Sequence, residues 1–352
     1  MSFLQEHSTI DVSATGFGTQ PAVPPRVAVV IPSYRVKAHL LDVIAGIPAL
    51  VERIYVVDDA CPEGSGALVE AQCIDRRVRV HRNAVNLGVG GTVMAGYLLA
   101  VEAGMDIVVK MDGDGQMDPA ALPELIGPIV RGEADYTKGN RFYDLTQIGR
   151  MPRMRILGNA ALSFMTKLSS GYWDLFDPTN GYTALHCRVV PKLPLEKISK
   201  RYFFESDMLF RLNIIRAVVV DVPMDARYGA EVSNLSISKV LFDFSYKHSR
   251  NTFKRIFYNY FLRDLSLASL ELVVGMGFLL TGLAMGVLFW VKSAQTGVTA
   301  SAGSVTLVAL LVIVAIQLLL GFLAYDIASV PRRAVHRLLT SRRGMSGGGE
   351  RA

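Results

Sequence analysis

Cysteine is scarce in this chain, with Cys61, Cys73 and Cys187 the only three among 352 residues. Their spacing matches no zinc or haem motif, and an odd number of cysteines argues against a disulfide framework. We therefore expect reduced thiols that serve mainly in packing, as is usual in a reducing compartment. The N-terminus also lacks the basic start and apolar core of a secretory signal, which predicts a flexible tail over residues 1–25.

Charge is absent from two long stretches, residues 272–291 and 305–325, where much of the 51% hydrophobic content is concentrated. Each stretch is long enough to cross a hydrocarbon core as a helix, which needs about 20 residues. The alternative is a pair of buried core helices, but globular helices rarely run so long without a polar face. We predict a transmembrane hairpin over residues 265–330.

Basic residues flank these stretches and account for the net charge of +6. The connector between the stretches has only Lys292, whereas basic residues precede the first stretch and follow the second: Lys239, Lys247, Arg250, Lys254, Arg255 and Arg263, then Arg332, Arg333, Arg337, Arg342 and Arg343. The positive-inside rule therefore places both ends of the hairpin in the cytoplasm, with a basic cytoplasmic tail over 331–352. Anionic lipid headgroups explain this pattern better than nucleic acid.

Short apolar runs alternate with helical stretches after the tail. The expected strands are 26–34, 53–60, 77–83 and 106–112, and the helices between them are 37–50, 64–75 and 90–104. This alternation predicts an α/β fold with a mostly parallel, Rossmann-like sheet covered on both faces. Ligands bind beyond the carboxyl ends of such strands, where polar residues gather here.

The pattern is mixed from residue 136 to residue 230, where we expect strands at 136–142 and 217–224 and helices at 153–168 and 203–216. A helix then follows over 239–263, within an amphipathic segment spanning 231–264. Its apolar stripe comprises Phe242, Tyr246, Phe253, Ile256, Phe257 and Tyr260, with basic residues off the stripe. Such a helix is typical of a membrane interface, and the alternative is a helix docked on the preceding domain.

Three carboxylates crowd the stretch "VVKMDGDGQMDP", residues 108–119. An EF-hand is excluded, because Met117 occupies the required glycine position and Pro123 the closing glutamate position. A turn with solvated aspartates remains one interpretation. The other is a Mg²⁺ or Mn²⁺ site that clamps a diphosphate, with Asp112, Asp114 and Gln116 as oxygen ligands.

The glycines of "NLGVGGTVMAGY", residues 86–97, do not form a dinucleotide fingerprint, because Val93 occupies the last glycine position. A loop that opens onto a helix N-terminus at Gly88 could still bind a phosphate through free N–H groups.

The motifs "VVIPSY", "VVDDACPEGS", "NLGVGG" and "KMDGDGQMDP", in this order, resemble those of family-2 glycosyltransferases of GT-A fold. "KGNRF" and "DPTNGYTAL" extend the likeness, which covers roughly residues 26–240 and implies a GT-A domain over 26–230. The hairpin also fits. The chain is most similar to the branch that contains dolichol-phosphate mannose synthases and bacterial polyprenyl-phosphate glycosyltransferases.

The resemblance implies roles for individual residues. The donor nucleotide would be held by Pro32, Tyr34, Asp58 and Asp59, and the metal and diphosphate by Asp112, Asp114 and Gln116. The acceptor phosphate would meet Arg141 and Arg153, with Arg227 and Lys239 as further candidates in a segment whose spacing departs from that of the relatives. Arg35-Val36 also replaces the Asn-Glu pair of many relatives. Asp207 lies where hydroxyl-transferring relatives keep a base, although here it could instead position a loop or a cation.

The implied activity is transfer of a hexose from a UDP- or GDP-sugar to a polyprenyl phosphate, with inversion at the sugar carbon. The enzyme would be a multi-pass protein of the cytoplasmic membrane with its catalytic domain in the cytoplasm, and it could form homo-oligomers. A lipid phosphate is already ionised, so it requires cations for positioning rather than a general base. The alternatives are a polysaccharide-synthase-like enzyme with a hydroxyl acceptor and a non-catalytic sugar-nucleotide-binding protein.

Overall fold

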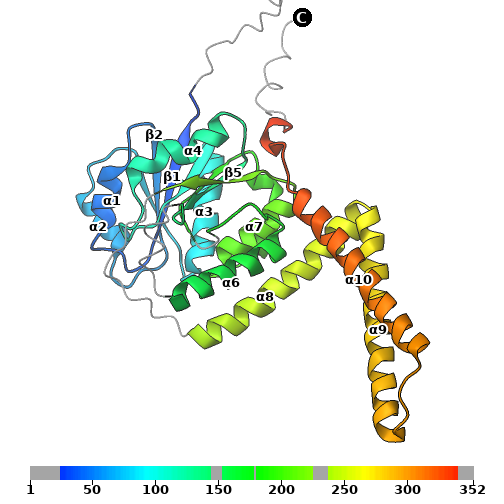
Figure 1. Cartoon of the computed structure of the whole chain (residues 1–352). Helices are drawn as coiled ribbons and strands as arrows, with labels where there is room; N and C mark the ends of the chain where they lie inside the picture. The colour runs from blue at the N-terminus through cyan, green and yellow to red at the C-terminus, as the bar shows by residue number, and fades with distance from the viewer. Residues whose placement is uncertain (1–23, 144–152, 178–179, 225–236, 340–352) are drawn as a thin grey trace, which may run out of the picture.

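The computed structural model describes residues 24–143, 153–177, 180–224 and 237–339, with the side chains of all but 153–157 and 237–241. A seven-stranded sheet in the order β3-β2-β1-β4-β6-β5-β7 forms the centre of the N-terminal domain (Figure 1). Its strands are β1 (Val27–Ser33), β2 (Val51–Asp58), β3 (Val78–Arg82), β4 (Ile107–Lys110), β5 (Tyr136–Asn140), β6 (Thr183–His186) and β7 (Val219–Pro223). β6 runs antiparallel to both of its neighbours, and the other pairings are parallel.

Helices cover both faces of this sheet, as Figure 1 shows. They are α1 (Leu40–Gly46), α2 (Ser65–Gln72), α3 (Gly88–Glu102), α4 (Leu122–Val130), α6 (Arg153–Ser170) and α7 (Phe204–Ile214). Ala28 and Val30 of β1 join a core with residues of α3 and α7, whereas Val29 and Ile31 join a second core with residues of α1 and α4. The predicted mostly parallel sheet with two covered faces is confirmed. The sequence did not predict β6 or α4.

The chain continues into α8 (Ile237–Phe257), a π-helical turn (Tyr258–Arg263) and two long helices, α9 (Leu267–Thr296) and α10 (Ala302–Ala328). α9 and α10 are long and apolar enough to cross a membrane, and only 11% of the most apolar 18-residue stretch of each helix is buried. Their close packing depends on glycine, because a Cβ at Gly282 would lie 3.0 Å from Val312 Cγ2, and one at Gly286 would lie 3.3 Å from Val308 Cγ1. These small residues, four apart in α9, let the two helices approach each other closely.

The segment after α10 differs from the predicted basic tail. Residues 331–339 return to the N-terminal domain, where Ala334 is buried in the core that includes α4 residues. Asp135, just before β5, accepts hydrogen bonds from the backbone N–H groups of Val335 and His336 at 2.8 and 2.7 Å. The ring of His336 also donates to Asp135 through Nδ1 at 2.8 Å and stacks on the ring of His186. The rest of the predicted tail lies outside the described residues.

α8 combines the two arrangements that its sequence left open. One face packs on the domain, where Asn251 Nδ2 donates to Asp207 and His248 Nδ1 lies 2.8 Å from Ser169 Oγ. The opposite face presents large apolar side chains that are well exposed: Phe242, Tyr246, Phe253 and Phe257. Tyr260, predicted to share this stripe, is buried instead. The helix is therefore docked on the domain and amphipathic at the same time.

His248 should make the protein less stable in mild acid. Its ring is buried against Phe203 and Phe244, and this burial lowers its pKa to about 4. In the unfolded chain histidine binds a proton near pH 6.5, so between about pH 6.5 and pH 4 the unfolded state binds more protons than the folded state. At pH 5 this difference costs about 2 kcal/mol of unfolding free energy relative to pH 7.

The measurement is the unfolding free energy of wild type and His248→Gln in detergent at pH 7 and pH 5. Between pH 7 and pH 5, we expect the unfolding free energy of His248→Gln to fall by about 2 kcal/mol less than that of the wild type. His81→Gln serves as the control because His81 is exposed on β3, and it should follow the wild type. Identical pH dependence in wild type and His248→Gln would contradict the assignment.

Candidate active site

The acidic loop after β4 lies at the carboxyl end of the central strands, as its sequence predicted. Gly115 has φ +80°, a backbone conformation that favours glycine, and it closes a turn in which Asp114 Oδ1 accepts the N–H of Gln116 at 3.0 Å. Asp112, Asp114 and Gln116 are each half-buried. The turn therefore holds three side chains with oxygen atoms at the rim of the sheet.

Lys110 and Glu205 join this loop and were not predicted as site residues. The Nζ atom of Lys110 lies 2.9 Å from Asp112 Oδ1 and 3.5 Å from Glu205 Oε1. Burial alone would lower the pKa of this fully buried lysine, but the charges of Asp112 and Glu205 outweigh that effect and raise it. Lys110 thus stays protonated and neutralises Asp112, which leaves Asp114 as the better carboxylate for a metal ion.

No three His, Cys, Asp or Glu side chains gather as a metal site within the described ranges. A cation at this loop would therefore take its other ligands from amide oxygen, water and substrate. That mixture is usual for Mg²⁺, which is held by one or two carboxylates together with substrate phosphates. The residues present fit such an ion.

Asp58 and Asp59, predicted to hold the donor nucleotide, use their carboxylates to shape the loops around the crevice. Asp58 accepts the N–H groups of Cys61 and Gly66, both at 2.8 Å. Asp59 accepts the N–H groups of Leu87 and Gly88 at 2.7 and 2.8 Å. Their nucleotide contacts stay a prediction.

The start of α3, where Gly88 was predicted to meet a phosphate, binds a carboxylate of the protein itself. The N–H of Gly88 donates to Asp59, and that of Gly90 donates to the carbonyl oxygen of Lys200 at 2.9 Å. Gly88 has φ +78°, and a Cβ there would lie 2.5 Å from the same carbonyl oxygen. Gly88 therefore permits a close approach of two loops, and its N–H group is already used.

A cavity of about 260 Å³ opens beside these loops and is lined by residues that include Asp58, Cys61, Arg82 and Asn83. Pro32 and Tyr34 follow nearby at the end of β1, with Pro32 half-buried and Tyr34 exposed. Arg35 and Ala60 adopt positive φ values of 57° and 54°. Non-glycine residues in this conformation are strained, and such strain is concentrated at functional sites.

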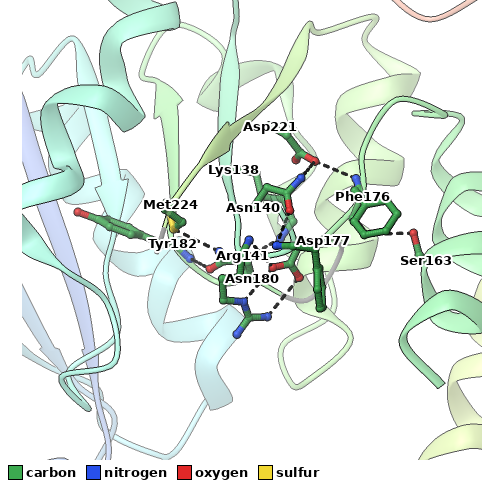
Figure 2. Close-up of polar contacts among 11 residues, drawn as sticks. Lys138, Asn140, Arg141, Ser163, Phe176, Asp177, Asn180, Tyr182, Asp221 and Met224 are labelled. Carbon is green, nitrogen blue, oxygen red and sulfur yellow. Dashed lines mark hydrogen bonds and ion pairs between the residues drawn. The ribbon is translucent and has the colours of Figure 1, made fainter. Parts of the chain in front are cut away.

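Arg141 forms the second part of the site, at the end of β5 (Figure 2). Its Nε and Nη2 atoms donate to the two carboxylate oxygens of Asp177 at 2.8 and 3.2 Å. Asp177 is fully buried, whereas the Arg141 side chain is one third exposed. Burial would raise the pKa of Asp177, but the bonds from Arg141 and the charge of Lys138 outweigh it, so this pKa is lowered. Asp177 therefore fixes Arg141 in place as a cation.

More ionisable groups surround this pair. Lys138 is buried and donates to the carbonyl oxygen of Asn180, and burial lowers its pKa to about 8. Asp221 on β7 accepts hydrogen bonds from Asn140 Nδ2 and the N–H of Phe176, and burial raises its pKa to about 6. Figure 2 shows these side chains converging between β5, β7 and the loop before β6.

One chain segment connects the two parts of the site. Asp177 binds Arg141, and four residues later Gly181 packs so closely on the acidic loop that a Cβ there would lie 2.9 Å from Asp112 Oδ2. Four residues span at most ~14 Å. The arginine and the acidic loop therefore lie within reach of one small substrate.

Asp207, a candidate base, is buried and used within the protein. Its Oδ2 atom accepts the N–H of Ser199 and its Oδ1 atom accepts Asn251 Nδ2, both at 2.9 Å. These bonds favour the loop-positioning role that the sequence left open. Arg153 begins α6 and Lys239 lies in α8, but their side chains are outside the described residues, as is all of Arg227.

Comparisons with known proteins identify the family. A model of glycosyl transferase family 2 matches residues 28–193. An undecaprenyl-phosphate mannosyltransferase of Micrococcus luteus is 31% identical over 203 residues, which cover 56% of this chain and 82% of the relative. The chain belongs to glycosyl transferase family 2. A polyprenol monophosphomannose synthase of Mycolicibacterium smegmatis is 29% identical over 59% of this chain and 81% of its own length.

A comparison with solved structures supports the fold. Glucosyl-3-phosphoglycerate synthase from Mycobacterium tuberculosis, solved with Mn²⁺, UDP-glucose and phosphoglyceric acid, superposes with a TM-score of 0.50 at 20% identity. The match covers 66% of this chain and 79% of that protein. The predicted GT-A fold is confirmed, with a mostly parallel sheet followed by two candidate membrane-spanning helices.

Proposed function

We propose that this glycosyltransferase transfers a hexose from a nucleotide sugar to the phosphate of a polyprenyl-phosphate lipid. The observation that carries the proposal is the pairing of two sites on one short segment, the acidic loop at Gly181 and the fixed cation Arg141 at Asp177. The first suits a leaving diphosphate with its metal, and the second suits an acceptor phosphate. The names of the two bacterial relatives support the same acceptor class.

The donor would lie between the cavity at β2 and β3 and the acidic loop. The cavity suits a nucleobase, and the diphosphate would extend toward Asp114. Asp114 and Gln116 would hold Mg²⁺ or Mn²⁺, whose positive charge would stabilise the leaving diphosphate. Lys110 and Asp112 hold the loop in shape, and Asp112 could also meet the sugar nucleotide.

A phosphate acceptor also explains how Asp207 is used. A hydroxyl acceptor would need a general base within hydrogen-bond reach, but the Asp207 carboxylate is occupied by Ser199 and Asn251. An ionised phosphate oxygen attacks the sugar carbon without losing a proton. Arg141 orients it for direct displacement, which inverts the configuration at that carbon.

The test of this function uses membranes containing the protein and a panel of labelled UDP- and GDP-hexoses. We expect label from one donor in the lipid extract, only with added polyprenyl phosphate and a divalent cation. Transfer to a sugar hydroxyl would support a polysaccharide-synthase-like enzyme instead. Donor binding without turnover would support a non-catalytic protein.

The active site should face the cytoplasm, where nucleotide sugars are made. Basic residues flank both long helices, so the connector between α9 and α10 would lie on the opposite side. The exposed aromatic face of α8 would then lie at headgroup height, where the lipid phosphate reaches Arg141.

Cysteine labelling in a variant without Cys61, Cys73 and Cys187 tests this orientation. A cysteine at Thr296 should react with an impermeant reagent in intact cells, whereas a cysteine at Ser341 should react only after the cells are opened. The reverse pattern would separate the active site from its donor and disprove the proposed reaction.

A further inference from the structure

A buried carboxylate joins the membrane hairpin to the catalytic domain. Asp326, near the end of α10, is 2% exposed and accepts hydrogen bonds from Arg255 Nη1 at 2.6 Å and Nη2 at 3.0 Å. It also accepts the hydroxyl of Tyr260 at 2.6 Å and the indole Nε1–H of Trp173 at 2.9 Å. Four separate parts of the chain meet at this one side chain.

Neutralisation of Asp326 does not require Trp173. Arg255 already forms two charge-assisted hydrogen bonds with the carboxylate, which compensates its burial. The hydrogen bond from the indole links a second part of the protein to Asp326, because Trp173 does not belong to the helices at the membrane. It lies in residues 171–177, the loop between α6 and β6, which we call the bridging loop.

The bridging loop leads directly to Arg141. Three residues after Trp173, the N–H of Phe176 donates to Asp221 at 2.8 Å, and its carbonyl oxygen accepts Ser163 Oγ at 3.2 Å. The next residue is Asp177, which holds the guanidinium of Arg141 (Figure 2). The loop is thus fixed at one end by the hairpin and at the other by the acceptor arginine.

The chain that leaves the hairpin also contacts the strand that carries Arg141. Val335 and His336 bind Asp135 at the start of β5, and Arg141 follows the end of the same strand. The base of α10 therefore contacts the bridging loop, and the segment after α10 contacts the opposite end of the strand that leads to Arg141. Neither contact involves the acidic loop or the cavity at β2 and β3.

We propose that Trp173 is a positioning residue, through which the membrane hairpin sets the place of Arg141 for the acceptor phosphate. This inference rests on the proposed function. The hydrogen bond from Trp173 to Asp326 would affect use of the lipid phosphate and leave binding of the nucleotide sugar unchanged.

The test is Trp173→Phe, which removes the indole donor and keeps an aromatic ring beside Phe164. We expect the KM for polyprenyl phosphate to rise about 10-fold, as for one lost positioning hydrogen bond. The Kd for the nucleotide sugar, measured by calorimetry, should stay unchanged. Ser329→Ala is the matched control, because Ser329 bonds Tyr260 and the Asp326 carbonyl at the same helix end without touching the bridging loop.

A double-mutant cycle with Arg141→Ala distinguishes positioning from a general loss of structure. If Trp173 acts through Arg141, Trp173→Phe has no further effect on lipid use in the Arg141→Ala background. Hydrogen exchange of residues 171–177 should rise in Trp173→Phe and not in Ser329→Ala. An additive loss, equal weakening of both substrates, or unchanged lipid KM in an active enzyme would overturn the inference alone. A wild type that transfers no sugar to lipid phosphate would overturn the proposed function, and this inference with it.

Discussion

An Asp114→Asn variant is expected to lose at least about 100-fold in kcat while keeping its fold. The asparagine Oδ1 atom can still accept the N–H of Gln116, so the turn at Gly115 should persist. The loss arises because the leaving diphosphate would be held by a metal ion that has lost its charged protein ligand. We expect Asp112 to replace it poorly, because Asp112 already pairs with Lys110. Lipid-extractable product and calorimetric binding of Mn²⁺ with donor measure the two effects.

Asp118→Asn is the matched control for this prediction. Asp118 lies in the same loop, but its carboxylate accepts the N–H of Ala120 at the start of a short 3₁₀ helix, which an asparagine can also do. The control should retain activity within a few-fold. Wild-type turnover by Asp114→Asn, or by wild type in excess chelator, would disprove the metal site.

An Arg141→Ala variant is expected to lose about 100-fold in kcat/KM for polyprenyl phosphate, with an unchanged Kd for the donor. This corresponds to about 3 kcal/mol, the order of a charge-assisted pair with phosphate. The variant also leaves Asp177 buried without its cation, which is destabilising. Arg141→Ala combined with Asp177→Asn removes both charges and should restore the melting temperature without restoring lipid use.

Arg131→Ala provides the matched control, because Arg131 is exposed at the end of α4 and pairs only with its neighbour Glu133 among the contacts described here. It should behave as wild type in both assays. Normal lipid kinetics in the Arg141→Ala, Asp177→Asn double variant would show that Arg141 does not position the acceptor. If use of the lipid and binding of the donor weakened equally, Arg141 would support the active site as a whole and not the acceptor alone.

The parts of the fold that the sequence predicted are those governed by local pattern. Continuous apolar runs identify β1, β2 and β4 because both of their faces are buried, and charge-free length identifies α9 and α10. The strand β6 escaped prediction because four residues, Thr183–His186, carry too little pattern. Its direction is decided by pairing with β4 and β5, which lie far away in sequence.

In the candidate site, too, the sequence predicted the features that depend on neighbouring residues. The acidic loop could be predicted because its carboxylates lie close together in sequence, and the motif "KGNRF" indicated Arg141 as a candidate. The partners that determine their chemistry could not, since Glu205 lies 95 residues after Lys110 and Asp177 lies 36 residues after Arg141. Asp59, expected to hold the donor nucleotide, also has a structural role that the sequence did not predict, because both of its carboxylate oxygens accept backbone N–H groups of residues 87 and 88.

The return of the chain after α10 governs how the enzyme could be shortened. The buried carboxylate of Asp135 accepts one hydrogen bond from Val218 N–H and three from Val335 and His336. Stopping the chain before α9 would remove those three donors and uncover the core at Ala334. A water-soluble form should instead omit only the hairpin, by joining the end of the π-helical turn to residue 330 through a short linker. The hairpin is thus an insertion into the catalytic domain, and the domain ends only after His336.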